Sequence, residues 1–308
     1  MRVLFFGTPE FAVPSLTALV GEGFDVVAVV TRADKPTGRH RSSVTASPVK
    51  LAAIAEELTV LQPEKPSAES FAAQARALEP DIAVVVAYGH ILKPELLAVP
   101  RLGSVNVHAS LLPRLRGAAP IERAILEGFA ETGVTIMQMD AGMDTGPILH
   151  QVSTPIVPEE TGGELRTRLA EVGALALVEA LTLLDETGIA PKAQVESAAT
   201  YAPKLTRAEE KIDWLQDAEL VARRIRAFDP GPGAWTSCRG KALKLFDARA
   251  LAVAAGAPGT VLAAGESLRV ACGSGAIEAC EVQPEGKARM PVRAFVNGRG
   301  VEVGDVLA

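Results

Sequence analysis

The sequence predicts an α/β fold, in which a Rossmann-like parallel sheet is followed by a small β-barrel of the oligonucleotide-binding (OB) type. Three observations support this prediction. Short apolar runs alternate with helix-like segments up to about residue 187, as in a parallel sheet with crossover helices. A connector with glycine and proline but no clear period follows. The remaining residues hold five or six short strand-like segments separated by glycine. We therefore expect a first domain over 1–189, a linker over 190–206 and a second domain over 207–308.

The elements of the first domain follow from local apolar patterns. Runs of apolar and β-branched residues predict strands, and apolar residues repeated every three to four positions predict helices. The predicted strands are Val3–Gly7, Val26–Thr31, Ile82–Ala87, Ser104–His108 and Val134–Met139. The predicted helices lie near Phe11–Val20, Pro48–Leu58, Ala68–Leu78, Ala118–Glu127 and Leu165–Leu184.

The second domain has a different pattern, with one helix and then mainly strands. The helix is expected near Ala218–Phe228, and it is followed by Pro230, Gly231, Pro232 and Gly233. The predicted strands are Ala234–Cys238, Ala242–Ala248, Gly259–Leu262, Leu268–Ala271, Ala276–Val282 and Val292–Val296.

Composition excludes several classes of protein. With 308 residues, 48% of them hydrophobic, the chain is long enough for a full core in about two domains. No apolar run approaches the roughly 20 residues of a membrane span, and the strand-like N-terminus does not resemble a signal peptide, so we expect a cytoplasmic protein. The three cysteines have no CxxC spacing and the four histidines no HExxH spacing, so no metal is expected.

The net charge of −6 is unevenly distributed along the chain. Residues 1–206 carry 17 Lys and Arg against 24 Asp and Glu, whereas residues 207–308 carry 14 against 13. An acidic protein neutralises few phosphates overall. Any contact with RNA must therefore come from local basic patches.

The ends of the predicted strands are the first places to look for chemistry, because ligands of open α/β sheets bind outside the carboxyl ends of the strands. The first such turn, Gly7-Thr8-Pro9-Glu10, is not a GxGxxG motif. A proline, which has no N–H, stands where an amide would bind phosphate. This argues against a dinucleotide-binding oxidoreductase.

Two later strand ends are more informative. The period of two places Asn106 and His108 on one face of their strand, although a single histidine of this kind is more often structural than catalytic. The loop Asp140–Pro147 has carboxylates suited to orient a histidine and glycines that permit close approach to a flat ligand; a plain Asp/Gly turn is the simpler alternative. Between them, the non-helical stretch 110–117 is expected to expose backbone groups, Arg114 and Arg116.

Together these segments carry a resemblance. Asn106-Val107-His108, Ser110-Leu111-Leu112-Pro113 with Arg116-Gly117, and Asp144-Thr145-Gly146 resemble the formyltransferase family that uses 10-formyltetrahydrofolate. The similarity also includes Gly7-Thr8-Pro9-Glu10-Phe11-Ala12, residues 84–89, 116–121 and 131–140, and Arg226-Ala227-Phe228-Asp229-Pro230 in the second domain. It is strongest to those members whose acceptor is methionine carried on initiator tRNA.

The resemblance implies roles for particular residues. The acceptor amine attacks the formyl carbon of 10-formyltetrahydrofolate directly, without metal or covalent intermediate. Asn106 is expected to stabilise charge on the formyl oxygen, His108 to handle the proton of the attacking nitrogen, and Asp144 to orient His108. The expected folate contacts are Ser110, Leu111, Leu112, Pro113, Tyr88, Gly89 and His90.

The resemblance further implies a partner, the initiator Met-tRNA. A basic loop after the second strand, with Arg39 and Arg41, is expected to contact the acceptor arm; a merely solvated loop is the alternative. The family expectation is a monomer without membrane contact.

Two other functions remain open at this point. A formyltransferase acting on an amino-sugar nucleotide or another small amine shares the same signature residues and can carry a similar barrel. A folate- or RNA-binding module without catalysis is the second, but a binding protein has no need of an Asn, His and Asp set at a strand end.

Overall fold

A computed structural model describes residues 1–37, 43–66, 68–252 and 256–308 of the chain. These residues form two compact units, each built from several stretches. Unit 1 contains Met1–Gly117, Glu131–Thr154 and Arg166–Ala202, and unit 2 contains Ala118–Ala130, Pro155–Leu165 and Pro203–Ala308. The predicted domains and linker are continuous ranges, whereas these units interleave along the chain. The limits 1–189, 190–206 and 207–308 therefore stay a prediction.

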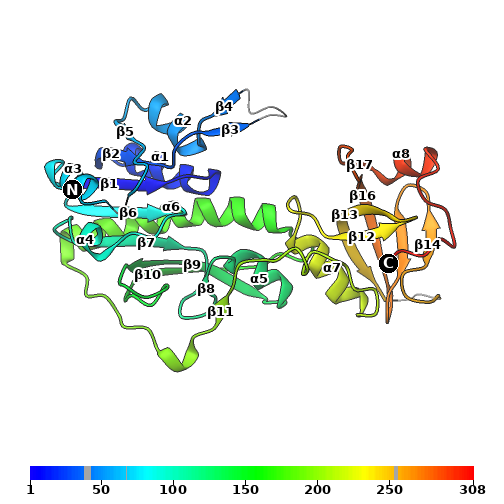
Figure 1. Ribbon diagram of the computed structural model, residues 1–308. Coiled ribbons are helices and arrows are strands. Elements are labelled where there is room, and N and C mark those ends of the chain that lie inside the picture. The colour runs from blue at the N-terminus through cyan, green and yellow to red at the C-terminus, as the bar shows by residue number, and fades with distance from the viewer. Residues whose placement is uncertain (38–42, 67, 253–255) are drawn as a thin grey trace. The chain divides into compact units, whose positions relative to one another are not determined.

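Unit 1 is built on a seven-stranded sheet with the strand order β10-β9-β7-β6-β1-β2-β5 (Figure 1). The strands are β1 Arg2–Gly7, β2 Asp25–Val30, β5 Val60–Leu61, β6 Ile82–Val86, β7 Ser104–His108, β9 Glu131–Gln138 and β10 Ile148–Pro155. The pairs β1·β2, β1·β6, β2·β5 and β6·β7 are parallel, which confirms the predicted parallel sheet. Strand β9 differs, because it pairs antiparallel with β7. The chain therefore leaves β9 beside the start of β7, away from the end of β7 that carries His108.

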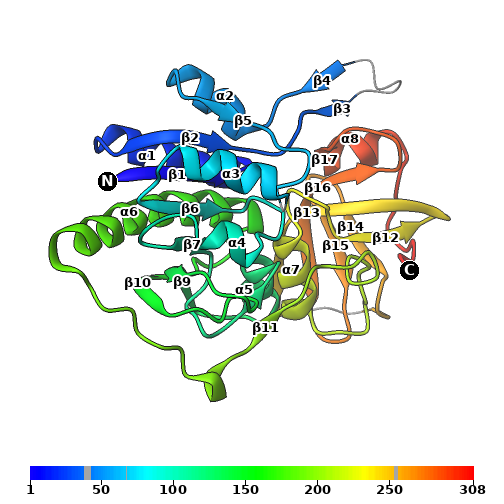
Figure 2. The ribbon, with the colours of Figure 1, turned by 60° about the vertical axis from the view of Figure 1, so that its left-hand side comes forward.

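Helices cover both faces of this sheet (Figures 1 and 2). The helical segments are η1 Glu10–Ala12, α1 Val13–Gly21, α2 Pro48–Ala55, α3 Glu69–Ala77, α4 Pro94–Leu97 and the long α6 Gly162–Thr187. On one face Leu4 and Phe6 of β1 pack with Phe71 of α3 and Leu96 of α4. On the other face α6 approaches β7 so closely that a Cβ added to Gly173 would lie 3.0 Å from Val107.

The packing of the helices shows on which face of the sheet the polar side chains of β7 lie. Asn106 is in register with Val85 of β6, and Val85 belongs to the cluster that contains Phe71. Because alternate residues of a strand point to opposite faces, Asn106 and His108 lie on the face opposite to α6. The prediction that these two side chains emerge together is confirmed by this register.

Several short elements of unit 1 were not predicted. They are β3 Lys35–Thr37, β4 Ser43–Thr45, β8 Arg116–Gly117, η2 Glu196–Ala198 and β11 Tyr201–Ala202, besides β5, β10 and α4. The strands β8 and β11 pair in parallel, with Arg116 opposite Tyr201 and Gly117 opposite Ala202. Such two- and three-residue pairings have no sequence period of their own, so only tertiary contacts reveal them.

Unit 2 contains an antiparallel sheet in the order β12-β13-β16-β15-β14, with β17 on β16. Its strands are β12 Trp235–Cys238, β13 Lys241–Leu251, β14 Val261–Ala264, β15 Leu268–Ala271, β16 Ala276–Pro284 and β17 Met290–Pro291. The C-terminal residues bridge the two edge strands: Ala308 exchanges backbone hydrogen bonds with Ser237, and the Val261 N–H donates to Asp305 O. The sheet is thereby curled toward closure, in agreement with the predicted small β-domain.

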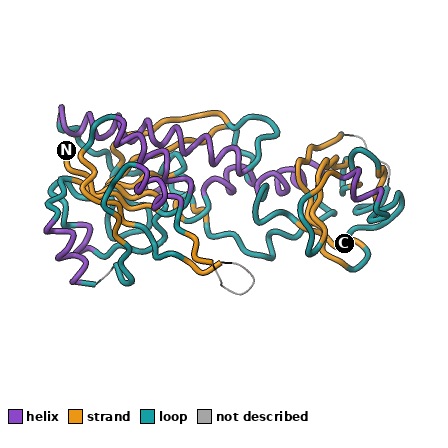
Figure 3. The backbone as a smooth tube through the Cα atoms, turned by 90° about the horizontal axis from the view of Figure 1, so that it is seen from above, coloured by secondary structure: helices purple, strands orange, loops and turns teal. Residues whose placement is uncertain are grey.

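The helices of unit 2 are α5 Pro120–Leu126, α7 Ala218–Ala227 and α8 Val292–Asn297. Helix α7 is capped by the Asp217 carboxylate, which accepts the Leu220 N–H at 3.0 Å. Its apolar face joins the core of the sheet through Val221, Ala222 and Ile225. Helix α8 lies beside the strands (Figure 3).

The predicted strand Val292–Val296 is wrong, because this segment is α8. Val292 is fully buried, and Phe295 and Val296 pack against the same core. These positions are three and four residues apart, as on one face of a helix. An apolar run this short fits both periods, so the sequence could not decide between them.

In the described parts of the chain, no helix is long and apolar enough to cross a membrane.

Candidate active site

The centre of the site is the end of β7, where His108 is 5% exposed and Asn106 is half-buried. His108 lies opposite Thr135 of β9, and Asn106 lies opposite Met137. Among the residues that the structure describes, no hydrogen bond partner is found for the side-chain amide of Asn106. This amide therefore has two donors and an acceptor available for a ligand.

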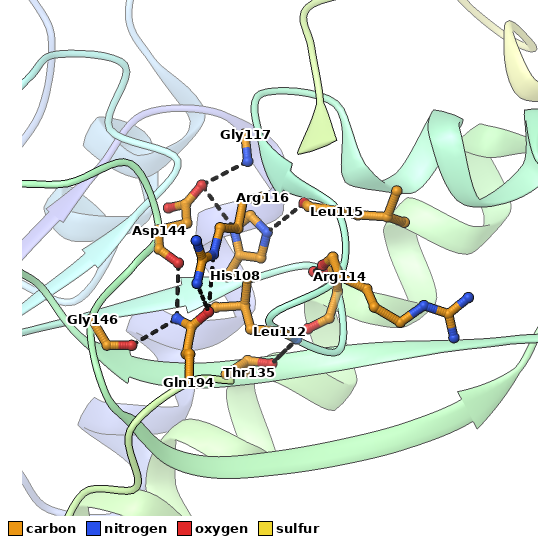
Figure 4. A network of polar contacts seen from close by, with 11 residues as sticks. His108, Leu112, Arg114, Leu115, Arg116, Gly117, Thr135, Asp144, Gly146 and Gln194 are labelled. Carbon is orange, nitrogen blue, oxygen red and sulfur yellow. Dashed lines mark hydrogen bonds and ion pairs between the residues drawn. The ribbon is translucent and has the colours of Figure 1, made fainter. Parts of the chain in front are cut away.

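Both ring nitrogens of His108 face oxygen atoms (Figure 4). Nε2 lies 3.0 Å from the carbonyl oxygen of Leu115, and Nδ1 lies 3.7 Å from Oδ2 of Asp144. Both oxygens only accept, and of the two contacts only the one at Nε2 is within hydrogen-bond distance, so we assign the proton of the neutral ring to Nε2. A proton taken up at Nδ1 would then face the Asp144 carboxylate.

The Asp144 carboxylate is held in place by the backbone of a neighbouring loop. Its Oδ2 accepts the N–H of Gly117 at 2.8 Å. The start of the same turn is fixed by Asp140, whose carboxylate accepts the Gly142 N–H at 2.9 Å and the Thr145 hydroxyl at 2.8 Å. Because β9 runs antiparallel to β7, this turn has to fold back across the sheet to bring Asp144 to His108.

Two glycines make this arrangement sterically possible. Gly117 has φ +120°, and a Cβ there would lie 2.7 Å from the carbonyl oxygen of Ala202. At Gly146 a Cβ would lie 1.8 Å from the carbonyl oxygen of Gln138. No side chain fits at either position without moving backbone, so both loops depend on glycine.

The stretch after β7 is fixed by a buried threonine. The Thr135 hydroxyl donates to Ser110 O at 2.6 Å and accepts the N–H of Leu112 at 3.0 Å. The Gln151 side chain donates to Thr135 and to Leu112 O, both at 2.9 Å. Leu111 and Pro113 remain partly exposed, whereas Ser110 and Leu112 are buried. The four predicted folate contacts 110–113 therefore lie directly beside His108, and their role stays a prediction.

The other predicted folate contacts, 88–90, follow β6. Tyr88 is buried among core residues and packs edge-on against Phe6, with 5.4 Å between ring centroids. Burial raises the pKa of its hydroxyl to about 12. Gly89 and His90 are exposed. Gly89 and His90 are therefore the accessible members of this set, whereas Tyr88 is closed to a ligand.

The arginines near the site differ from the expectation. Arg116 was expected to be exposed, but it is 1% exposed. Its guanidinium donates to Gln194 and to the carboxylate of Glu196, with distances of 2.9 to 3.0 Å. These hydrogen bonds make burial of the charge possible. Arg114 is exposed, as expected. Arg39 and Arg41, the predicted tRNA contacts, lie outside the described residues.

Sequence reasoning missed Gln194, Thr135 and Gln151, which hold the loops around His108. None of them stands in a recognisable motif, and Gln194 lies in the segment predicted to be a linker. Within the described ranges, no group of three or more His, Cys, Asp or Glu residues is placed to hold a metal ion.

Comparison with known proteins identifies the relatives of this chain. The family model described as "Formyl transferase" matches residues 1–181, and the model described as "Formyl transferase, C-terminal domain" matches residues 204–300. A methionyl-tRNA formyltransferase of Methylococcus capsulatus is 47% identical over 302 residues, covering 98% of each chain. One of Xylella fastidiosa is 50% identical over 303 residues, covering 97% of this chain and 98% of the relative.

A solved structure shares the fold at lower identity. It is an N-formyltransferase from Helicobacter canadensis in complex with folinic acid and dTDP-3-aminofucose. Its TM-score is 0.70 at 20% identity, and the match covers 92% of this chain and 99% of that one.

Proposed function

The chain belongs to the formyl transferase family and, within it, to the methionyl-tRNA formyltransferases, and from this premise we propose how its residues perform the reaction. The enzyme transfers a formyl group to the α-amine of methionine on Met-tRNA, and we infer that 10-formyltetrahydrofolate is the donor and initiator Met-tRNA the acceptor. The observation that carries the assignment is identity of about half over nearly the whole length of both chains.

The reaction forms one C–N bond and breaks another. The methionine nitrogen attacks the formyl carbon, the bond from that carbon to the folate nitrogen breaks, and one proton moves from the attacking nitrogen to the departing one. Negative charge develops on the formyl oxygen during the attack. The enzyme must therefore orient the amine, stabilise that oxygen and move the proton.

Asn106 is proposed as the donor to the formyl oxygen. Its side-chain amide is half-buried at the end of β7 and has no partner among the described residues. A donor that the protein leaves unpaired beside the reacting group is available to stabilise an oxyanion.

His108 and Asp144 are proposed to handle the proton. Nε2 donates to Leu115 O at 3.0 Å, so Nδ1 is the basic nitrogen of the neutral ring. A ring protonated at Nδ1 faces Leu115 O on one side and the Asp144 carboxylate, at 3.7 Å, on the other. The doubly protonated ring thus has an oxygen near each nitrogen.

The folate is proposed to contact two loops beside this centre. Ser110, Leu111, Leu112 and Pro113 directly follow β7, and Tyr88, Gly89 and His90 follow β6. The two strands are parallel neighbours, so both loops leave the sheet at the same edge. The accessible groups, Leu111, Pro113, Gly89 and His90, are the ones we expect to touch the donor.

The acceptor is tested by competition. Formyl transfer from labelled 10-formyltetrahydrofolate is measured with initiator Met-tRNA, elongator Met-tRNA and an amino-sugar nucleotide present together. Label on the initiator supports the proposal. Preferential label on the sugar would assign the chain to the amino-sugar formyltransferases. Folate binding without transfer to any amine would mean that the chain is a binding module without catalysis.

A further inference from the structure

The segment between the two regions matched by the family models lies against the candidate active site. Residues 182–203 are outside both matched regions, and residues 166–202 belong to unit 1. Within this segment Lys192 exchanges two backbone hydrogen bonds with Ile148, each 2.8 Å long. The chain therefore enters the neighbourhood of the site beside β10.

Gln194 holds the loop that carries Asp144. Its Nε2 donates to the carbonyl oxygen of Asp144 at 2.8 Å and to that of Gly146 at 2.7 Å. The two hydrogens of a primary amide suffice for both bonds. Asp144 itself has φ +54°, a left-handed conformation that a residue with a side chain adopts at a cost, so external hydrogen bonds help to keep it.

Arg116 determines which way the Gln194 amide points. Its Nε and Nη2 donate to Oε1 of Gln194 at 3.0 and 2.9 Å. A guanidinium can only donate, and the two loop carbonyls can only accept. In a flipped amide the NH2 group of Gln194 would face the N–H groups of Arg116, and its oxygen would face the two carbonyl oxygens. The buried Arg116 thus aims both N–H groups of Gln194 at the loop (Figure 4).

The same segment fixes the opposite side of the catalytic pair. The Thr200 hydroxyl accepts the N–H of Leu115 at 2.9 Å, and Thr200 O accepts the N–H of Arg116 at 2.8 Å. Leu115 binds His108 through its carbonyl oxygen, and the neighbouring Gly117 donates to Asp144. Gln194 and Thr200 therefore bind both loops that face His108 through hydrogen bonds.

We propose that Gln194 is a positioning residue for formyl transfer, holding Asp144 against His108 through the carbonyl groups of the 144–146 loop. This inference rests on the proposed function of His108 and Asp144. It predicts that the loss of the two Gln194 donors lowers the rate of the chemical step and leaves the binding of both substrates intact.

The decisive variant is Gln194→Glu. Glutamate has the same shape and keeps an oxygen for Arg116, but it places an oxygen instead of an N–H group against the two loop carbonyls. We expect kcat to fall about 100-fold, as for a small misplacement of a reacting group, while the KM values for tRNA and folate stay unchanged, with all rates measured well below the melting temperature of each variant. The control is Gln74→Glu, the same change on the exposed surface of α3.

A double variant separates positioning from a general structural effect. If Gln194 acts through Asp144, Gln194→Glu in an Asp144→Asn background causes no further loss of kcat. The inference would be overturned if the kcat losses of the two single variants multiply in the double variant. It would also be overturned if Gln194→Glu changes KM without changing kcat. If wild-type enzyme transfers no formyl group, or Asp144→Asn retains the full rate, the proposed function fails instead. If Asp144→Asn is slow but Gln194→Glu is normal, only this inference fails.

Discussion

The carboxylate of Asp144 lies 3.7 Å from Nδ1 of His108, although the two residues leave the sheet at opposite edges. His108 ends β7, whereas the loop of Asp144 follows β9, which runs antiparallel to β7. The loop reaches the histidine by folding back, and the Gly117 N–H holds its carboxylate at 2.8 Å. The pair thus depends on loop contacts more than on the strands themselves.

Asn106 is expected to contribute to the rate. The Asn106→Ala variant loses the amide that we assign to the formyl oxygen, so kcat should fall by about 100- to 1,000-fold. Because the side chain is half-buried and has no partner in the described residues, the melting temperature should change little. Steady-state kinetics with saturating folate and Met-tRNA test this prediction. A kcat within threefold or so of the wild type would exclude the oxyanion role.

Thr135 is expected to contribute to stability. The Thr135→Val change keeps the shape but removes the acceptor for the buried Leu112 N–H. Leaving such a group unsatisfied costs about 1–3 kcal/mol. Urea denaturation should show this loss in the free energy of unfolding, and the KM for folate should rise because the 110–113 loop loosens. An unchanged free energy of unfolding would contradict the assigned role of the Thr135 hydroxyl.

Arg39 is expected to act on the tRNA alone. For Arg39→Ala we predict a higher KM for Met-tRNA and an unchanged KM for folate. If the side chain neutralises a phosphate, the slope of log kcat/KM against log salt should also become shallower by about 1. Arg41→Ala provides the comparison within the same loop. Identical tRNA kinetics in both variants and the wild type would contradict the tRNA contact and favour the alternative of a merely solvated loop.

The second unit offers a prediction on pH. Glu278 is almost fully buried, and hydrogen bonds from Arg269, Ser267 and Arg249 lower the pKa of its carboxyl to about 2. The folded-state pKa is below the ordinary 4.5, so this carboxylate stabilises the fold above about pH 4.5 and loses its contribution as pH falls toward about 2.

The comparison of wild type with Glu278→Gln tests this prediction. We expect the variant to be clearly less stable at about pH 6 and the difference to shrink at about pH 3.5. Glu285→Gln changes an exposed glutamate of the same unit and serves as the control. A difference that is constant with pH would contradict the assignment.

How far the sequence predicted the fold depended on the length of each pattern. The strand Ser104–His108 and the strand Leu268–Ala271 were predicted to the residue, because each has a clear apolar period. The segment Val292–Val296 was not, since five residues fit a helix and a strand equally well. Strand β9 was found, but its direction was not, because direction is set by tertiary packing.

The candidate site was predicted in its central residues and missed in its supports. The period of β7 placed Asn106 and His108 together, and the resemblance added Asp144. Nothing in the sequence indicated that Gln194 would reach the loop from 50 residues away, or that Arg116 would be buried. Such contacts depend on where a chain without regular period happens to pack, and only the structure contains that information.

The central claim is that His108 and Asp144 carry the proton of formyl transfer. It is tested most directly by the single-turnover rate of Asp144→Asn with both substrates saturating, since asparagine keeps an oxygen for the Gly117 N–H while the charge is removed and the other oxygen becomes an NH2 group. We predict a rate at least about 100-fold below that of the wild type with the melting temperature unchanged. A rate close to that of the wild type would contradict the account.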